Sequence, residues 1–327
     1  MLSQDIQEIK KPSVNIEVSY KQQYNPILSV NPQYTVVIPE ASVKSDTMFQ
    51  NDLPEGSVQP SSNGTSSRTN TIPQSKLASG FGAHASIFAK RQGYPDEIYE
   101  MLTEYVQNKE NVLDLGCGTG IATKSLIKIF SNVRGCDWDK DMIKEAENND
   151  SGHFDVGSAY DLPYEDGQFG LVTCFGSYHW FCDNEATKEI SRVLKPSGYL
   201  LVVSGSPGNS KKITGAFSDS QKIIEEVVTD AKIVHPRETY FPIEVLERNG
   251  FEIVKTEDVV ETKSYTVDDI LDVIQTRHMW QYAIQAKKED VILQKLKEHF
   301  ESIKDKNGLV YDYMPQFRIV AKKKSKN

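Results

Sequence analysis

The sequence predicts an α/β fold built on a doubly wound, mostly parallel sheet of seven strands. Two observations carry this prediction. Short apolar runs of strand type alternate with amphipathic helical stretches from residue 95 to residue 205. One of these runs, Val112–Leu115, is followed by glycines at alternate positions, Gly116, Gly118 and Gly120, and then by a helical stretch. Strands that alternate with helices at this spacing favour a parallel sheet with helices on both faces.

The elements follow from apolar periodicity and from cap and turn residues. Residues 1–77 are rich in Ser, Asn, Gln, Pro and Thr, so we expect a polar, largely disordered arm. The predicted domain covers residues 78–327, with helical cap elements at about 206–249 and 266–305, the second being an insertion of two helices before the last strand. Strands are expected at 111–115, 133–137, 154–156, 169–175, 199–203, 251–260 and 311–320. The other helices are expected at 95–102, 121–130, 139–148, 184–194, 215–230 and 242–249.

Composition narrows the classes of function. The 327 residues carry a formal charge of -9, which offers no overall basic surface for nucleic acid. No apolar stretch approaches the length of a membrane span, and we see no targeting peptide. The four cysteines form no C-x-x-C pair, which indicates thiols in a reducing compartment and no zinc site. We therefore expect a cytoplasmic protein without a metal, and the oligomeric state stays open.

The glycine-rich stretch predicts a cofactor site. A strand, a glycine turn and a helix N-terminus form the geometry in which open α/β sheets bind nucleotide-like cofactors. The glycines follow G-x-G-x-G, not the dinucleotide pattern G-x-G-x-x-G, and the acid Asp114 suits a cationic ligand. Asp137 ends the next strand, 21 positions after Gly116, where a carboxylate can accept from ribose hydroxyls. Trp138 could stack on adenine or belong to the core.

Four ordered motifs are similar to those of the class I S-adenosylmethionine-dependent methyltransferases. The first is G-x-G-x-G after V-L-D-L. The second is the acid that ends the next strand. The third, residues 157–164, resembles the family's G-D-A-x-D-L-P-F loop, with Ser158 where Asp is common. The fourth, residues 169–172 with 194–199, resembles F-D-L-V and L-K-P-G-G. The resemblance implies S-adenosylmethionine as cofactor, held by a set of residues around these motifs: Asp114, Gly116, Cys117, Gly118, Asp137, Trp138, Ser158 and Ala159.

A narrower resemblance concerns the region after the fourth strand. Residues 175–181 contain H-W-F, which resembles a signature of the trans-aconitate methyltransferase-like group of type 11 methyltransferases. Residues 91–95 resemble the R-P-x-Y-P segment of that group. We expect Tyr94 and Phe175 beside the cofactor, and Tyr178 and Trp180 beside the acceptor.

His179 is the candidate catalytic residue, because it follows the carboxyl end of the fourth strand. It could act as a base toward a hydroxyl, orient a carboxylate, or serve only in packing. The leading hypothesis is methyl transfer to oxygen, on a carboxylate or hydroxyl of a small molecule. C-methylation of a quinone- or sterol-like acceptor stays open, as does a non-catalytic protein that binds S-adenosylmethionine.

Overall fold

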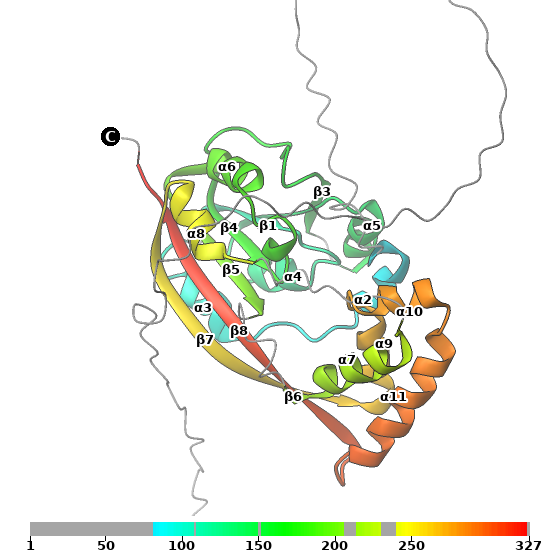
Figure 1. Ribbon diagram of the computed structural model, residues 1–327. Helices are drawn as coiled ribbons and strands as arrows, with labels where there is room; N and C mark the ends of the chain where they lie inside the picture. The colour runs from blue at the N-terminus through cyan, green and yellow to red at the C-terminus, as the bar shows by residue number, and fades with distance from the viewer. Residues whose placement is uncertain (1–80, 108, 150–151, 206–213, 230–239, 326–327) are drawn as a thin grey trace, which may run out of the picture. The chain divides into compact units, whose positions relative to one another are not determined.

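One mixed sheet of eight strands organises the part of the chain that the structure describes (Figure 1). This computed structural model describes residues 81–325 except 108, 150–151, 206–213 and 230–239, so the arm expected at residues 1–77 lies outside the described residues. The strands are β1 (Asn111–Leu115), β2 (Asn132–Asp137), β3 (His153–Val156), β4 (Phe169–Phe175), β5 (Leu194–Gly205), β6 (Thr214–Gly215), β7 (Phe251–Thr266) and β8 (Leu309–Lys323).

The first five strands form the parallel half of the sheet. β1 lies between β2 and β4, β3 pairs with β2, and β5 pairs with β4, all in parallel. β8 adds to β5 in antiparallel orientation, and β7 and β6 pair with β8. The doubly wound, mostly parallel sheet predicted from the sequence is confirmed. The two-residue β6 is an eighth strand that the sequence pattern did not predict.

Helices cover both faces of this sheet, because successive residues of each central strand point to opposite faces and both are apolar. Val112 packs in a core with Leu126, whereas its neighbour Leu113 packs in a second core with Ile190. The helical elements are η2 (Phe81–His84), α2 (Ala85–Phe88), α3 (Asp96–Leu102), α4 (Ile121–Ile127), α5 (Lys140–Asn149), η3 (Tyr178–Trp180), α6 (Asn184–Val193), α7 (Ala216–Val227), α8 (Pro242–Arg248), α9 (Val267–Gln275), α10 (Trp280–Ala286) and α11 (Glu289–Ile303).

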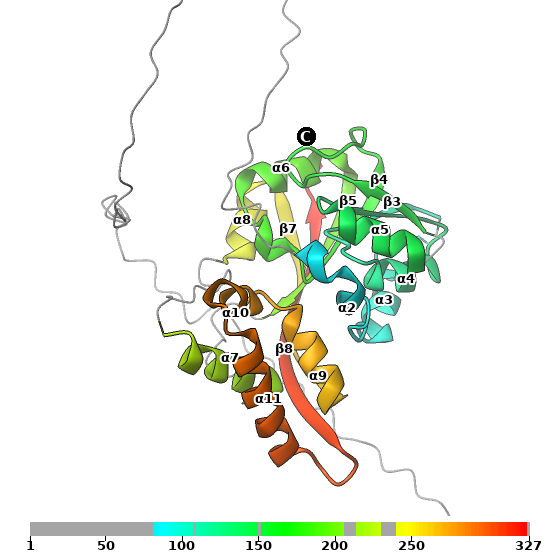
Figure 2. The same ribbon diagram turned by 90° about the vertical axis from the view of Figure 1, so that its right-hand side faces the viewer.

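β7 and β8 form a long antiparallel ribbon that extends past the parallel half of the sheet (Figure 2). β5 pairs with residues 316–322 of β8, while β7 pairs along residues 309–323. A third core gathers α7, α9, α10 and α11 at the far end of the ribbon. We call this part the cap.

The cap contains three helices between β7 and β8, whereas the sequence predicted two. The apolar spacing of Val267, Ile270, Leu271 and Ile274 continues to His278 and predicts a helix of that length, but α9 ends at Gln275. At that end Thr276 donates its hydroxyl to the carbonyl of Val273 over 2.6 Å and accepts Arg91 Nε over 2.7 Å. α9 ends beside these bonds, and a turn over residues 276–279 leads into α10.

Residues 81–95, the leading segment, connect the parallel half of the sheet to the cap. The Gly82 amide donates to Asp139 Oδ2 at the start of α5 over 2.9 Å. Lys263 of β7 donates to the carbonyl of Gly93 over 3.0 Å, and Arg91 binds Thr276 at the end of α9. The leading segment therefore lies against both parts of the molecule.

Candidate functional site

The glycine turn between β1 and α4 is the first component of the site. Gly116, Gly118 and Gly120 have φ angles of 70°, 55° and 80°, a region that costs other residues about 1–2 kcal/mol. A Cβ on Gly116 would lie 2.4 Å from Ser177 Cβ, and one on Gly120 would lie 3.0 Å from the ring of Phe154. A Cβ on Gly118 would meet no described atom closer than 3.7 Å. The backbone at Gly118 is thus open to a ligand, while the other two glycines are required by packing.

Asp137 lies at the end of β2, beside this turn. Its Oδ2 accepts from the Gly118 amide over 2.9 Å, and its Oδ1 accepts from the Asp139 amide over 3.0 Å. Burial raises the pKa of Asp137, and the two backbone donors act in the opposite direction. Each carboxylate oxygen keeps a further lone pair for a hydroxyl donor. Asp137 is therefore fixed at the end of β2, beside the glycine turn, with acceptor capacity left on both oxygens.

Asp114 lies behind the turn and not at its open side. Its two oxygens accept from the hydroxyls of Thr123, over 2.6 Å, and Thr173, over 3.0 Å. The side chain is fully buried, and this burial raises its pKa to about 6. Asp114 therefore links β1 to α4 and β4 through hydrogen bonds. Because its side chain is fully buried, it can affect a bound cofactor only through the glycine turn that it supports. Cys117 is half-buried in the turn, and burial raises the pKa of its thiol.

The loop after β3 folds back onto the end of β2. The Gly157 amide donates to the Asp137 main-chain carbonyl over 2.9 Å, so Ser158 and Ala159 follow close to the end of β2. Ser158 Oγ accepts from the Tyr160 amide over 3.2 Å, and Ala159 is buried. The loop predicted to contact adenine is thus next to Asp137.

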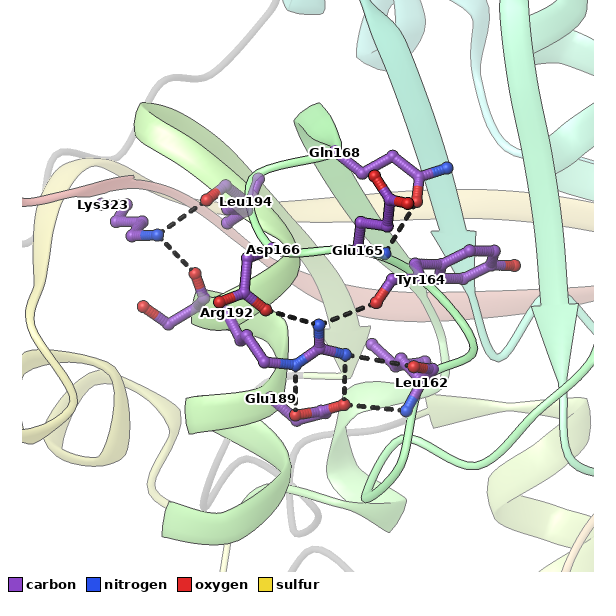
Figure 3. Close-up of polar contacts among 10 residues, drawn as sticks. Leu162, Tyr164, Glu165, Asp166, Gln168, Glu189, Arg192, Leu194 and Lys323 are labelled. Atoms are coloured by element: carbon purple, nitrogen blue, oxygen red, sulfur yellow. Dashed lines mark hydrogen bonds and ion pairs between the residues drawn. The ribbon is translucent and has the colours of Figure 1, made fainter.

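Arg192 of α6 fixes the continuation of that loop (Figure 3). Its Nη2 donates to the Leu162 carbonyl over 3.1 Å, and its Nη1 donates to the Tyr164 carbonyl over 2.7 Å. The guanidinium also binds Glu189 through two nitrogens and Asp166 through Nη1. Glu189 in turn accepts from the Leu162 amide over 2.9 Å. All five N–H groups of the guanidinium are therefore used: three bind residues 162–166 and two bind Glu189 of α6, so the loop is held against this helix.

The end of β4 lies next to the glycine turn. Ser177 Oγ donates to the Leu115 carbonyl over 2.7 Å, which joins the ends of β4 and β1. Tyr178 is fully buried, and its hydroxyl shares a 2.7 Å hydrogen bond with Thr187. Tyr178 thus packs in the core and presents no surface to an acceptor. Its neighbour Trp180 is half-buried and retains accessible surface.

An aromatic wall continues from β4 into the cap. The rings of His179 and Trp180 lie 5.0 Å apart, and His278 packs edge-on against Trp180 at 5.5 Å. Tyr240 approaches His179 at 6.2 Å, and Tyr282 approaches His278 at 5.6 Å. The cap thereby contributes His278 and Tyr282 to the same wall as the predicted catalytic histidine.

Three further predicted residues differ in their surroundings. Tyr94 of the leading segment packs on Phe175 with ring centroids 4.8 Å apart, and its hydroxyl lies 2.8 Å from the position of a Cβ on Gly176. Tyr94 and Phe175 therefore form one aromatic pair at the end of β4. Trp138 follows Asp137 and is 43% exposed, so its ring is available to a ligand and not part of the core.

The sequence did not assign Arg91, Tyr240, Arg277 and Tyr282 to the site. Tyr240 and Tyr282 belong to no motif. Arg91 lies in the R-Q-G-Y-P segment, and this motif was the one sequence signal that could have assigned Arg91 to the site. Arg277 comes from a turn 186 residues further along, and no local pattern relates the two arginines.

Residues 113–202 match a family described as a methyltransferase domain. The match contains the glycine turn, Asp137, the loop after β3, His179 and Arg192. An uncharacterised methyltransferase of Schizosaccharomyces pombe is 37% identical over 130 residues, which are 37% of this chain and 49% of the relative. A Dictyostelium discoideum protein described as a candidate methyltransferase is 25% identical over 266 residues, which are 78% of this chain and 99% of the relative.

Two relatives carry names that include a substrate. Demethylmenaquinone methyltransferase of Thermotoga maritima is 34% identical over 122 residues, which are 36% of this chain and 52% of the relative. Malonyl-[acyl-carrier protein] O-methyltransferase of Hahella chejuensis is 30% identical over 138 residues, which are 40% of this chain and 50% of the relative. The chain thus spans about half the length of three of these four relatives.

A solved structure supports the fold. A candidate type II methyltransferase from Anaeromyxobacter dehalogenans gives a TM-score of 0.51 at 15% identity, covering 72% of this chain and 97% of that chain. At this identity the similarity concerns the fold alone.

Proposed function

Since the chain belongs to the class I S-adenosylmethionine-dependent methyltransferases, we propose that it transfers a methyl group to an oxygen atom of a small-molecule acceptor. The observation that carries the proposal is the meeting of two groups at one edge of the sheet. The open backbone of Gly118 follows β1, and the His179–Trp180 pair follows β4. The bond from Ser177 to the Leu115 carbonyl holds these ends together. Ligands of open α/β sheets bind at this edge.

The residues present fit S-adenosylmethionine. Gly118 leaves a space that a methyl group would fill, and Asp137 keeps acceptor capacity for two ribose hydroxyls. Ser158 and Ala159 lie beside Asp137 for the adenine edge, and the exposed Trp138 can cover one face of the base. When bound, this cofactor supplies a methyl group on a sulfonium that is already a good leaving group.

The protein then has two tasks. It must hold the acceptor oxygen in line with the methyl group, which is an effect of orientation. It must also accept a proton if the acceptor is a hydroxyl, and we assign this role to His179, which follows the carboxyl end of β4. A carboxylate is already ionised at neutral pH, so His179 would need only to orient it.

Two relatives support different accepting atoms. The malonyl-[acyl-carrier protein] O-methyltransferase supports oxygen, in agreement with a histidine in the wall. The demethylmenaquinone methyltransferase keeps a quinone-type acceptor as the alternative, because an aromatic wall also suits a flat apolar molecule. The same experiment must therefore distinguish the accepting atoms.

The test uses the full chain, S-adenosylmethionine labelled in its methyl group, and an extract of small metabolites. We expect a labelled small molecule. Alkaline hydrolysis releases the label as methanol from a carboxyl ester, and hydriodic acid releases it as iodomethane from a methyl ether, whereas a methyl group on carbon stays attached in both treatments. Binding of S-adenosylhomocysteine without any transfer from the donor would favour the non-catalytic alternative. Absence of binding by folded protein would overturn the proposal.

Among the described helices, none combines the length and the apolar content needed to cross a membrane. All four cysteines, Cys117, Cys136, Cys174 and Cys182, are free thiols. Free thiols are typical of a reducing compartment and support the proposed cytoplasmic location. Imaging of a tagged full chain in its own cells tests that location.

A further inference from the structure

Two arginines meet where the leading segment touches the cap. Arg91 donates through Nε to Thr276 Oγ1 over 2.7 Å and through Nη2 to the Thr276 carbonyl over 2.8 Å, which brings it next to Arg277. Each guanidinium carbon lies 3.9 Å from an aromatic centroid, Arg91 over Phe88 and Arg277 over Phe217. Stacking of this kind fixes the plane of a guanidinium and leaves the N–H groups at its edge able to donate.

Positive charges gather at this contact. Burial and the charge of Arg277 lower the pKa of Arg91 to about 9, so Arg91 stays protonated at neutral pH. Burial also lowers the pKa of Arg277, and Asp312 acts on it in the opposite direction. Lys263 is a third cation in this group, and it pairs with Glu261 at 3.4 Å. The charges of Arg91 and Arg277 therefore oppose each other within this group.

The two arginines lie between the cofactor turn and the aromatic wall. Phe88, beneath Arg91, lies 3.7 Å from the position of a Cβ on Gly118. His278, the residue after Arg277, packs on Trp180 at 5.5 Å. Arg91 and Arg277 are half-buried, so each residue keeps some accessible surface.

We propose that Arg91 and Arg277 together bind an oxyanion of the acceptor, a carboxylate or a phosphate, at the end remote from the accepting oxygen. This inference rests on the proposed function, because the acceptor is that of the same site. The edge of a guanidinium matches both groups through paired hydrogen bonds. An oxyanion would also compensate two like charges that now oppose each other. An acceptor without charge leaves them opposed, so the pair selects for anions.

The test is calorimetric titration of the full chain saturated with S-adenosylhomocysteine. The probes are glutarate, its uncharged dimethyl ester and inorganic phosphate. We expect glutarate or phosphate to bind about tenfold or more tightly than the ester, a difference typical of charge-assisted bonds. Tighter binding of glutarate assigns the site to carboxylates, and tighter binding of phosphate assigns it to phosphate esters.

Two variants and one control complete the experiment. Arg91→Gln and Arg277→Gln should each weaken anion binding about tenfold or more, with the affinity for S-adenosylhomocysteine unchanged. Arg248→Gln, at an exposed arginine of α8, should change neither. If Arg91→Gln releases the leading segment and no longer binds S-adenosylhomocysteine, the anion affinities of Arg277→Gln and Arg277→Lys test the inference instead. Equal binding of ester and anions, or no binding of either anion, overturns the inference. Loss of S-adenosylhomocysteine binding by the wild type would instead overturn the proposed function.

Discussion

Gly118→Ala separates the binding role of the glycine turn from its role in folding. The new methyl group would meet no described atom closer than 3.7 Å, so the folded chain can accommodate it. It would nevertheless occupy the space beside the backbone where we place the cofactor. A ligand in contact with Gly118 must then move outward by about the length of a carbon–carbon bond. We expect the Kd for S-adenosylhomocysteine to rise about tenfold or more, equivalent to about 1.4 kcal/mol.

The same substitution also has a conformational cost that is independent of any ligand. Gly118 has φ +55°, where an L-residue loses about 1–2 kcal/mol. Gly250 is a matched control, because it has φ +84° at the end of α8 and no neighbour within 4 Å. We expect Gly118→Ala and Gly250→Ala to lower the Tm by similar amounts, about 2–8 °C for a domain of this size.

Calorimetric titration and thermal unfolding, measured on both variants and the wild type, give the two quantities. The reasoning holds if the Tm values fall together while the affinity falls only in Gly118→Ala. It is refuted if Gly118→Ala binds S-adenosylhomocysteine as tightly as the wild type. Equal loss of affinity in Gly250→Ala would refute it too, because that result would assign the effect to stability.

Four further predictions concern single residues of the site. Asp137→Ala should raise the Kd for S-adenosylhomocysteine about tenfold or more, and an unchanged titration would contradict the ribose role. Arg192→Ala should lower the Tm and weaken the same binding because residues 162–166 lose their anchor, while Arg248→Ala, measured in parallel, should leave the affinity intact. Burial raises the pKa of Asp114 to about 6 from 3.8, so the folded state binds more protons than the unfolded chain between about pH 4 and 6. Urea unfolding should therefore show that the free energy of unfolding of the wild type falls by about 3 kcal/mol as the pH rises from about 4 to about 6. Asp114→Asn should lack this pH dependence. His179→Gln should lower kcat about 100-fold if the acceptor is a hydroxyl, and a pH–rate profile that stays unchanged would leave His179 only an orienting role.

Much of the cofactor half could be predicted because its signals are local. The spacing of the glycines reflects three left-handed backbone positions in one turn, and Asp137 follows its strand at the expected distance. Parallel strands bring such strand ends to one edge, so residues identified separately come together. The fold and the cofactor were therefore accessible from the sequence.

The acceptor side depends on contacts between distant segments. Arg91 and Arg277 meet only because the leading segment lies against the end of α9, and no periodicity encodes that contact. Tyr178 shows a second difficulty. Its position in the H-W-F region suggested an acceptor contact, but a short η3 turn directs it into the core against Thr187. His278 shows a third, because Thr276 ends the helix that its apolar periodicity would continue.

The β7–β8 ribbon joins two parts of the molecule, the sheet and the cap, and lets one change while the other stays fixed. At residues 316–322, β8 is a sheet strand whose neighbours fix its register on both sides. At residues 309–315 β8 no longer pairs with β5, and it packs against the cap core instead. A hydrogen-bonded ribbon is stiff along its length. The ribbon is anchored at one end in the parallel half of the sheet and holds the cap at its other end. Substitutions in α7, α9, α10 or α11 can therefore change the proposed acceptor side, while residues 316–322 of β8 and the glycine turn keep their positions.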